Sequence, residues 1–370
     1  GGHHRHPRGA AAVALAATSP SSAAAGEGEE PWEKALKTAG NVLWAVLRAL
    51  PDIFSAPPEE PTGKNAPGLV ALGDAGVVGA LKGCTIQAVR DGTTLQASEL
   101  AAGPGAKVLL FATHFGDFNS WEVAQQLRTA LSARRLGAGT TRAAIVGIGT
   151  PEAGRKFAEL LELPEDLPLY ADPKGACHAA LGFSNGALPE YREELNPYLR
   201  VFLMLLGVGS PGTIRTVLSG YFGNGALSKE RTAWVDEALK QGAAQGRFPT
   251  KVPQRLPWEE KKSPGEDEWV DLATAGSAVW DGRGFGESGL RPFELATVRL
   301  QNMVSGIIGN WGTLKPPDDE LLVRQGGAAV LDGNGEATYF YRDKGILTYA
   351  PVEDVLDAAR SLDTSGSGEK

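Results

Sequence analysis

The chain has 370 residues, of which 42% are hydrophobic and 22% charged, and its formal net charge is −8. This length allows one large domain with additions or two domains, and the composition is that of a globular protein. The acidic balance, with no basic stripe, argues against nucleic acid as a partner. The longest aliphatic run, residues 201–208, is far shorter than the roughly 20 residues of a membrane-spanning helix, so we expect no transmembrane span.

Residues 1–25 have the composition of a processing segment. They are rich in Ala and Ser, contain Arg5 and Arg8, and precede the first acidic residue, Glu27. This composition favours a plastid transit peptide, although the apolar stretch 10–17 is alternatively the core of a thylakoid-transfer signal. We therefore predict a chloroplast protein, in the stroma or associated with the thylakoid, with the lumen left open.

Three histidines near the start, His3, His4 and His6, are the first candidate metal ligands in the chain. We favour a flexible tail for this segment, because a metal site needs a fixed geometry. The two cysteines, Cys84 and Cys177, do not form a CxxC pair and are too few for a four-cysteine zinc site. We accordingly predict neither a metal nor a cofactor.

Residues 31–50 are predicted to form one amphipathic helix. Their apolar positions follow helical spacing, and Pro51 ends the pattern. The helix either packs on the domain, which we favour, or docks to a membrane surface or a partner. The segment 57–68 contains four prolines and is typical of a linker.

Strands and helices alternate after this linker. Residues 84–90 and 93–96 flank Asp91-Gly92, a strong hairpin signal. Continuous apolar runs at 107–113, 143–149 and 167–171 predict buried strands, and helical spacing predicts a helix over 118–135. Thr150-Pro151 and Asp172-Pro173 each combine an N-cap with a proline that begins a helix, and the second of these helices is expected to stop at Gly182.

The C-terminal part completes the pattern. Residues 328–331 and 336–341 are joined by a turn that contains Asp332 and Gly335, which predicts a hairpin, and 351–362 predicts a closing helix. The whole order indicates a three-layer α/β/α, thioredoxin-like fold with a mixed central sheet, an N-terminal helical extension and an insertion. The expected segments are a tail at 1–29, helix and linker at 30–66, the first part of the domain at 67–224, an insertion at 225–319, the second part at 320–362 and a flexible tail at 363–370.

The predicted insertion is rich in tryptophan and partly helical. Two amphipathic helices are expected within it, at 229–240 and 292–308, and the glycines of 282–286 are interpreted as a turn rather than a phosphate loop. Tryptophans are more often packing anchors than ligand cages, but they are also favoured at interface hot spots. The candidate partner-binding residues are Trp32, Trp44, Trp234, Trp258, Trp269, Trp280 and Trp311.

The segment VLLFATHFGDFNSWEVAQQL, residues 108–127, resembles the active-site region of peroxiredoxin-like 2 proteins, within the alkyl hydroperoxide reductase and thiol-specific antioxidant group. AIVGIGTPEAGRKF, LPLYADPKGACHAALGF, VLSGYFGN and LLVRQGGAAVLDGNGEATYFYRDKGI extend this resemblance over about 83–223 and 320–362. It implies a thioredoxin fold whose typical members read RHFGCxxC at the turn that leads into the first long helix.

This sequence departs from the family at the residues that carry the chemistry. The family's first cysteine falls on Asp117, the second on Ser120, and the arginine before His114 falls on Thr113. A carboxylate forms no sulfenic acid and exchanges no disulfide, whereas it can cap the helix. A hydrolytic site of Ser120 and His114 would need their side chains within hydrogen-bond reach, and we do not favour it.

Three functions are consistent with this degenerate motif. We expect a redox-inactive, peroxiredoxin-like pseudoenzyme that acts as a binding, scaffold or assembly subunit of a chloroplast complex, with a photosystem or its assembly machinery at the thylakoid as partner. The alternative is a thiol oxidoreductase or peroxidase of altered mechanism that uses Cys177, although buried structural cysteine is the common case. The third is a small-molecule binder in the cleft near Thr113, His114 and Asp117.

Overall fold

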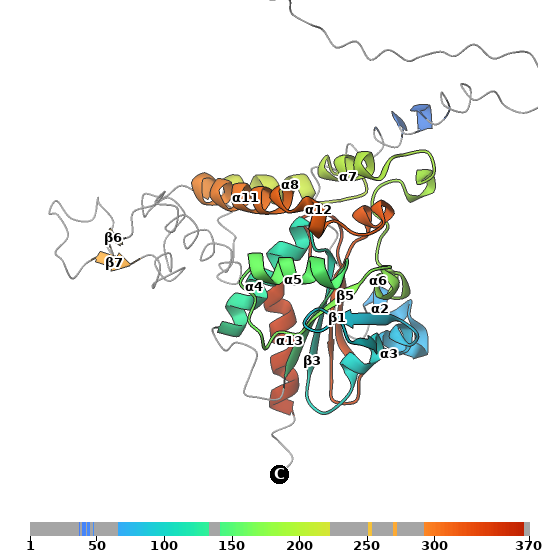
Figure 1. Cartoon of the computed structure of the whole chain (residues 1–370), viewed down its shortest axis with the longest axis vertical. Helices are drawn as coiled ribbons and strands as arrows, with labels where there is room; N and C mark the ends of the chain where they lie inside the picture. The colour runs from blue at the N-terminus through green and yellow to red at the C-terminus, as the bar shows by residue number, and fades with distance from the viewer. Residues whose placement is uncertain are drawn as a thin grey trace, which may run out of the picture.

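The computed structural model describes residues 37, 39–41, 43–44, 47, 66–132, 141–222, 251–253, 269–271 and 292–365 of the chain. Its centre is a mixed sheet of seven strands in the order β2-β1-β5-β4-β3-β8-β9 (Figure 1). These strands are β1 (Thr85–Ala88), β2 (Thr94–Gln96), β3 (Lys107–His114), β4 (Arg142–Ile148), β5 (Leu169–Asp172), β8 (Gly327–Leu331) and β9 (Ala337–Arg342). Strands β3, β4 and β5 run parallel, and the outer pairs are antiparallel.

Strand β3 is central, and every one of its residues is buried. Its neighbours are β4 on one side and β8 on the other. Because side chains alternate along a strand, Val108 and Leu110 enter one apolar cluster while Leu109 and Phe111 enter the other. A continuous apolar run is what a strand covered on both faces requires, so the sequence pattern and the burial agree.

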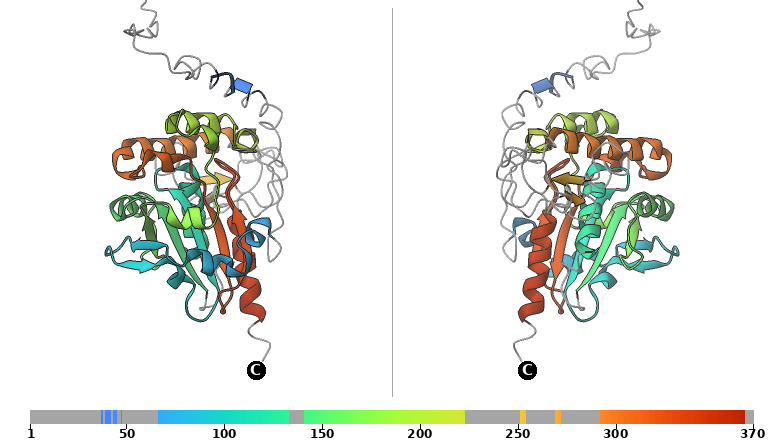
Figure 2. Two further views of the ribbon diagram at one scale, coloured as in Figure 1. Left: turned by 90° about the vertical axis from the view of Figure 1, so that its right-hand side faces the viewer. Right: turned by 90° about the vertical axis from the view of Figure 1, so that its left-hand side faces the viewer.

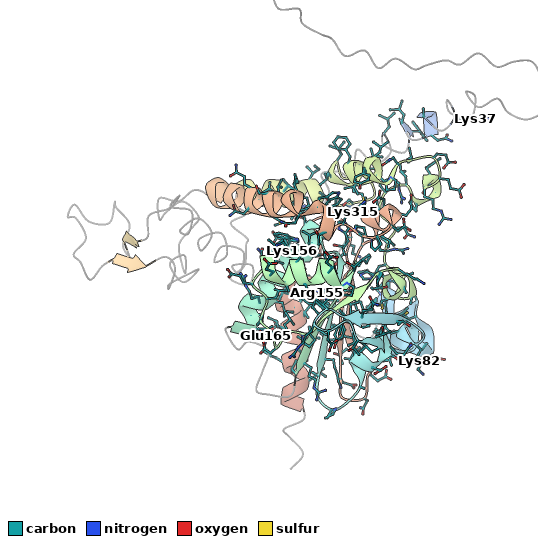
Figure 3. All side chains as sticks on the ribbon, viewed as in Figure 1. Lys37, Lys82, Arg155, Lys156, Glu165 and Lys315 are labelled. Carbon is teal, nitrogen blue, oxygen red and sulfur yellow. The ribbon has the colours of Figure 1, made fainter. Side chains whose placement is uncertain are left out.

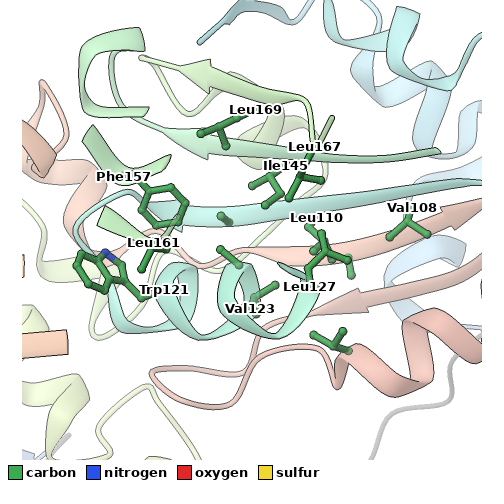
Figure 4. Close-up of a cluster of buried hydrophobic side chains, with 14 of the residues drawn as sticks. Val108, Leu110, Trp121, Val123, Leu127, Ile145, Phe157, Leu161, Leu167 and Leu169 are labelled. Atoms are coloured by element: carbon green, nitrogen blue, oxygen red, sulfur yellow. The ribbon is translucent and has the colours of Figure 1, made fainter. Parts of the chain in front are cut away.

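Three helices cover the first face of the sheet: α4 (Phe118–Ser132), α5 (Pro151–Leu160) and α13 (Val352–Ser365). Figure 4 shows Trp121 and Leu127 of α4 and Phe157 of α5 pointing into one cluster with Leu110 of β3 and Ile145 of β4. Thr150 caps α5 by accepting a hydrogen bond from Ala153 N at 3.1 Å, as its Thr-Pro signal predicts.

The opposite face carries shorter helices: α2 (Pro67–Val70), α3 (Gly76–Leu81) and α6 (Ala176–Ala180). Short 3-10 segments accompany them at Gly73–Ala75 and Ala97–Ala101. Val77, Leu81 and Leu181 pack there against the second side-chain row of β3. With helices on both faces, the sheet forms the middle of the three predicted layers.

Four further helices gather at one end of the sheet: α7 (Pro197–Leu205), α8 (Thr213–Phe222), α11 (Pro292–Gly309) and α12 (Trp311–Leu314). All views show α7, α8 and α11 together above this end (Figures 1 and 2). Two 3-10 segments, Pro189–Tyr191 and η7 (Asp319–Val323), connect this layer to the rest, and a small separate pair, β6 (Lys251–Pro253) and β7 (Trp269–Asp271), is also described. No helix in the described residues is long and apolar enough to cross a membrane.

Both predicted hairpins are present. Strand β1 pairs with β2 across Asp91-Gly92, and β8 pairs with β9 across the turn at Asp332. The helix expected directly after Asp172-Pro173 is wrong in its start, because the chain first turns and α6 begins only at Ala176. Gly175 adopts a φ of 62° in this turn, a conformation that glycine adopts without the cost other residues incur. The carboxylate of Asp172 nonetheless accepts hydrogen bonds from Ala176 N and Cys177 N.

Some predictions lie outside the described residues, among them the N-terminal tail, residues 366–370 of the C-terminal tail, the helix at 229–240, the glycines of 282–286 and Trp32, Trp234, Trp258 and Trp280. Residues 363–365, predicted as part of the flexible C-terminal tail, belong to α13. Of the predicted helix 31–50, the described residues are helical and exposed. The helix predicted at 292–308 is present as α11. Helices α3, α7 and α8 were not predicted from the sequence, although Asn196-Pro197 is a cap-and-proline signal for α7 and the Asn196 side chain accepts Tyr198 N at 2.9 Å.

Candidate functional site

The turn from β3 into α4 holds the residues that the sequence singled out. Strand β3 ends at His114, and α4 begins at Phe118. The backbone reverses through a hydrogen bond from Asp117 N to the His114 carbonyl at 3.0 Å, and Trp121 N then donates to the Asp117 carbonyl at 3.2 Å. Asp117 is therefore the N-cap residue of α4, the position at which a helix leaves backbone amides without partners.

One oxygen of the Asp117 carboxylate accepts two hydrogen bonds inside this turn. This Oδ2 atom accepts Thr113 Oγ1 at 2.6 Å and Asn119 N at 2.8 Å. A negative charge at a helix N-terminus is also favoured by the helix dipole. The three residues aligned with the family's Arg and two Cys therefore form one internal network, since the Thr113 and Ser120 hydroxyls are 2.8 Å apart.

Ser120 and the imidazole of His114 are not arranged as a nucleophile and its base. Ser120 is fully buried, and its hydroxyl donates to the His114 carbonyl oxygen at 2.8 Å. The His114 ring instead hydrogen-bonds the Leu322 backbone through one nitrogen, while its buried Nδ1 atom has no hydrogen-bond partner. Burial lowers the pKa of His114, although Asp117 and the Leu322 backbone oppose this, so the imidazole is neutral near pH 7.

Helix α12 covers the turn from outside. The ring of Trp311 meets the ring of His114 edge-on at 5.9 Å and meets Tyr198 of α7 at 6.4 Å. Gly116 lies directly beneath it, because a Cβ atom there would come within 3.0 Å of the Trp311 ring and 3.3 Å of Leu314 Cβ. Trp311, a predicted partner-binding residue, is thus partly buried against the turn from β3 into α4.

Helix α11 closes the neighbouring side. A Cβ atom at Gly306 would approach the Trp121 ring within 2.5 Å, so α11 packs closely on the first turn of α4. Trp121 is held from below as well, since its Nε1 donates to the Phe115 carbonyl at 2.9 Å. The second part of the predicted insertion therefore packs on the turn that the resemblance identifies as the family's active site.

Asn119 and Asp343 form a buried polar pair that sequence reasoning missed. The Asn119 side chain donates to the Gly345 carbonyl at 2.9 Å and accepts Leu347 N at 2.6 Å, which fastens α4 to the loop after β9. Asp343 accepts Ala350 N at 3.2 Å and hydrogen-bonds Asn119. Burial raises the pKa of Asp343 to about 8, and the nearby Asp117 adds to the rise. The sequence signal that could have indicated Asp343 is its position directly after a predicted strand, in the segment YRDKGI.

Two hollows lie in the described part of the chain near α4 and α12, and neither is a binding cleft at the predicted residues. A cavity of about 10 Å³ beside Asn119 and Asp343 has room for no more than a single water molecule. A larger hollow of about 230 Å³ is lined by Thr150, Glu152 and residues 312–313 and 315–317, not by Thr113, His114 or Asp117. Figure 3 shows Lys315 at this place, close to α5, which carries Arg155 and Lys156. The expected small-molecule cleft thus gains no geometric support from these two hollows.

Both cysteines lie away from the turn, on the opposite face of the sheet. Cys84 precedes β1 and Cys177 belongs to α6, and both are buried in the second apolar cluster. Burial and the nearby Asp172 raise the pKa of each thiol. Within the described part of the chain, no group of three or more His, Cys, Asp or Glu side chains is placed to hold a metal ion.

The remaining predicted site residues are placed as follows. Trp44 is helical and 61% exposed, and Trp269 lies in β7.

His178, which was not predicted, holds the end of β3 through a hydrogen-bond contact of 2.7 Å between its Nε2 and the Ala112 carbonyl. Its Nδ1 lies 3.6 Å from Asp172 Oδ2. Burial opposes ionisation of Asp172, but His178 and two backbone amides outweigh it and lower the pKa of Asp172.

The mixed sheet and the helices on both of its faces define a thioredoxin-like α/β protein. A family model described as AhpC/TSA antioxidant enzyme matches residues 126–345, more than half of the chain. The chain belongs to this AhpC/TSA family, within which it is peroxiredoxin-like. The match begins inside α4, after the turn at Thr113–Ser120.

No curated protein sequence gives a significant match. The crystal structure of peroxidoxin BcpB from Mycobacterium tuberculosis is similar over 28% of this chain, at 25% identity, with a TM-score of 0.22. The match spans 64% of that protein, less than two thirds of its length.

Proposed function

We propose that this chain is a non-catalytic AhpC/TSA-type protein that acts as a binding or assembly subunit of a protein complex. The observation that carries the proposal is the Thr113–Asp117–Ser120 network. In it, the carboxylate aligned with the family's first cysteine caps α4 and accepts two hydrogen bonds from within the turn. The hydroxyl groups of Thr113 and Ser120 likewise make their hydrogen bonds within the turn.

The chemistry of the turn supports the loss of peroxidase function. A thiolate at the helix N-terminus attacks a peroxide and becomes a sulfenic acid, whereas a carboxylate does neither. Ser120 has no base beside it, because its hydroxyl contacts a backbone carbonyl and the Thr113 hydroxyl. Trp311 and Leu314 also cover Gly116, in the middle of the turn. The retained fold is then a platform for other contacts.

Helix α7 offers such a contact surface. Arg200, Leu203 and Met204 point inward, and Arg200 fixes the helix through its Nε and Nη2 atoms, which donate to the carbonyls of Ala187 and Asn185 at 2.8 and 2.7 Å. The outward side is apolar, with side chains between 39% and 55% exposed. This α7 face consists of Tyr198, Leu199, Phe202, Leu205 and Leu206.

Five large apolar side chains that face solvent along one anchored helix are a feature of interaction sites. The helical residues near the N-terminus show the same character, because Leu43, Trp44 and Leu47 are 60%, 61% and 45% exposed. We infer a protein partner that covers the α7 face. The leader-like composition of residues 1–25 supports a chloroplast location, and a thylakoid-associated complex, a photosystem or its assembly machinery, is the partner class we propose.

A comparison of three full-length chains tests the binding role. They are the wild type, a Leu199→Gln/Phe202→Gln variant of the α7 face, and a Val70→Gln control, which changes an apolar side chain that is 65% exposed elsewhere. We expect the wild type and the control to sediment with isolated thylakoid membranes and to cross-link to the same partner. Loss of two interface contacts should weaken the capture of the α7 variant by about tenfold. Equal capture of all three chains, or no defined partner, would refute the proposal.

A second experiment tests the loss of chemistry. Purified chain is given hydrogen peroxide with thioredoxin or glutathione as reductant, and we expect no consumption above the blank. Turnover that disappears in a Cys177→Ala variant would instead favour the alternative, a thiol oxidoreductase that uses Cys177. The Asp117→Cys/Ser120→Cys variant provides the positive control, because restored thiol reactivity would show that the turn keeps its family geometry.

A further inference from the structure

The chain's two cysteines meet in the folded protein. Cys84 and Cys177 are the only cysteines among 370 residues, yet both lie in the second apolar cluster, where each thiol affects the pKa of the other. Cys84 is 6% exposed and Cys177 is fully buried. Cys84 Sγ is further placed by its hydrogen bond to the Ala80 carbonyl, at 3.7 Å.

The pairing of β1 with β5 explains why Cys84 and Cys177 lie in the same part of the fold. Strand β1 lies antiparallel to β5, with Gln87 opposite Ala171 and Ala88 opposite Tyr170. Because each step back along β1 is a step forward along its partner, Cys84 lies beside the chain that leads from β5 into α6. The first turn of α6 then carries Cys177, whose amide is held by Asp172 Oδ2 at 2.8 Å. The backbone topology therefore brings the two cysteines into the same buried cluster.

We propose that Cys84 and Cys177 form one intramolecular disulfide when the folded chain meets a low-molecular-weight disulfide oxidant, such as oxidised glutathione. The site is separate from the Asp117 turn, and the proposal does not depend on the binding role of the α7 face. A metal site at the same place is not indicated, since the described residues supply no cluster of three ligands.

The reaction is an ordinary double thiol–disulfide exchange. Cys84, the less buried thiol, loses its proton and attacks one sulfur of the oxidant, which forms a mixed disulfide and releases one thiolate. Cys177 then attacks the Cys84 sulfur, forms the Cys84–Cys177 bond and releases the second thiolate. The two protons lost by the protein are taken up by the two released thiolates. Two protein thiols and one disulfide thus yield one protein disulfide and two small thiols.

Because both thiols are buried, this exchange is slow and does not form a catalytic cycle. Since only thiolates attack disulfides, the raised pKa of both buried thiols disfavours the reaction in the closed structure. Local opening of α3 or α6 is needed to admit the oxidant, and both helices are short. The bond is therefore formed once, as a cross-link, and resists reduction afterwards for the same reason.

The cross-link would stiffen a segment that contacts the end of β3. It closes a loop of roughly ninety residues, which restricts the unfolded chain more than a short loop does. It also fastens α6, whose His178 contacts the Ala112 carbonyl one residue before Thr113. We therefore expect the oxidised chain to unfold at a higher urea concentration than the reduced one.

The test uses the full-length chain without denaturant. Reduced, desalted protein is incubated with oxidised glutathione, and the remaining thiols are then alkylated in denaturant before intact-mass and peptide analysis. We expect a product lighter by two hydrogen atoms, without alkyl or glutathione groups, and a cross-linked pair of peptides that contain Cys84 and Cys177. Products that carry glutathione or alkyl groups on both cysteines, without the cross-linked pair, would overturn the proposal.

Variants and a stability measurement complete the test. In a Cys84→Ser chain, Cys177 should form no disulfide within the chain and should be alkylated after unfolding. In a Cys84→Ser/Cys177→Ser chain, the urea midpoint of unfolding should be the same with and without oxidant. For the wild type, oxidation should raise the midpoint. An unchanged or lower midpoint in a chain that contains the bond would show that the native fold does not accommodate the bond, and would overturn the proposal as well.

Discussion

Thr113 Oγ1 donates a hydrogen bond of 2.6 Å to Asp117 Oδ2 across the turn that joins β3 to α4. The same carboxylate oxygen accepts Asn119 N at 2.8 Å, so one side chain ties the end of the strand to the first turn of the helix. In the family that this segment resembles, a nucleophilic cysteine occupies the place of Asp117. In this chain the carboxylate at that position caps the helix, and its two hydrogen bonds have measurable consequences.

The first prediction concerns Asp117 as a cap. In an Asp117→Ala chain, Asn119 N and the Thr113 hydroxyl lose their acceptor, and we expect the free energy of unfolding to fall by about 1–2 kcal/mol. Urea unfolding followed by circular dichroism measures this change. An Asp117→Asn chain is the matched control, since its amide oxygen still accepts hydrogen bonds, and it should lose about half as much or less. Equal losses in the two variants would contradict the capping role.

The second prediction concerns the contact of Gly116 with Trp311. A methyl group at Gly116 would lie 3.0 Å from the Trp311 ring, closer than ordinary van der Waals contact. We expect Gly116→Ala to destabilise the chain by about 1–3 kcal/mol, as overpacking does. In a Trp311→Ala background the same substitution should cost less, because the ring that it meets is gone.

A double-mutant cycle of these two residues gives the coupling directly. Urea midpoints of the wild type, both single variants and the double variant are required. Gly312→Ala is a suitable control, because nothing lies within 4 Å of a Cβ atom there. Additive effects of Gly116→Ala and Trp311→Ala would show that α12 does not cover the turn in solution.

The strands of the core could be predicted from sequence because their signals are local. The apolar run of β3 and the Asp91-Gly92 turn each act within a few residues, and both predictions are confirmed by the sheet. The cap at Thr150 is local as well. The start of α6 was mispredicted because Asp172 reaches past a turn to the amides of Ala176 and Cys177, a choice that the dipeptide Asp172-Pro173 does not reveal.

The surroundings of the site could not be predicted, because they depend on contacts between distant parts of the chain. Asn119 bonds to the backbone of Gly345 and Leu347, more than 200 positions away in sequence. Trp311 is one of eight tryptophans, and nothing in its local sequence marks it as the residue that packs on His114. The degenerate motif itself was visible in the sequence, whereas what covers it required the fold.

The third prediction concerns Arg200, which anchors the α7 face. Its guanidinium is buried, donates to the carbonyls of Ala187 and Asn185, and lies 3.3 Å from a carboxylate oxygen of Glu320. Arg200→Met leaves these carbonyls without their donors, so we expect a loss of roughly 2–4 kcal/mol in unfolding free energy. Arg192→Met, at an exposed position, should change it by less than about 0.5 kcal/mol. An Arg200→Met chain as stable as the Arg192→Met control would show that α7 is held in another way.

The last prediction uses the raised pKa of Asp343. Burial holds this pKa at about 8, whereas an unfolded aspartate titrates near 4. Between these values the folded chain keeps the proton that the unfolded chain has released, so unfolding becomes easier as the pH rises. The contribution of Asp343 to stability is therefore largest below pH 4, falls between pH 4 and 8, and is constant above pH 8.

An Asp343→Asn chain isolates this effect, because its side chain stays neutral and can still accept Ala350 N, the donor of a 3.2 Å hydrogen bond to Asp343. Urea unfolding of both chains should be measured from pH 5 to 9. As the pH rises, we expect the unfolding free energy of the wild type to fall relative to that of Asp343→Asn, by up to roughly 1 kcal/mol per pH unit. This fall should level off near pH 8. Asp354→Asn, in the closing helix, serves as the control for a carboxyl group elsewhere. Parallel curves for the wild type and Asp343→Asn would contradict this prediction. They would mean that the Asp343 carboxyl is already ionised in the folded chain at pH 5, with its charge stabilised by Asn119 and the Ala350 amide.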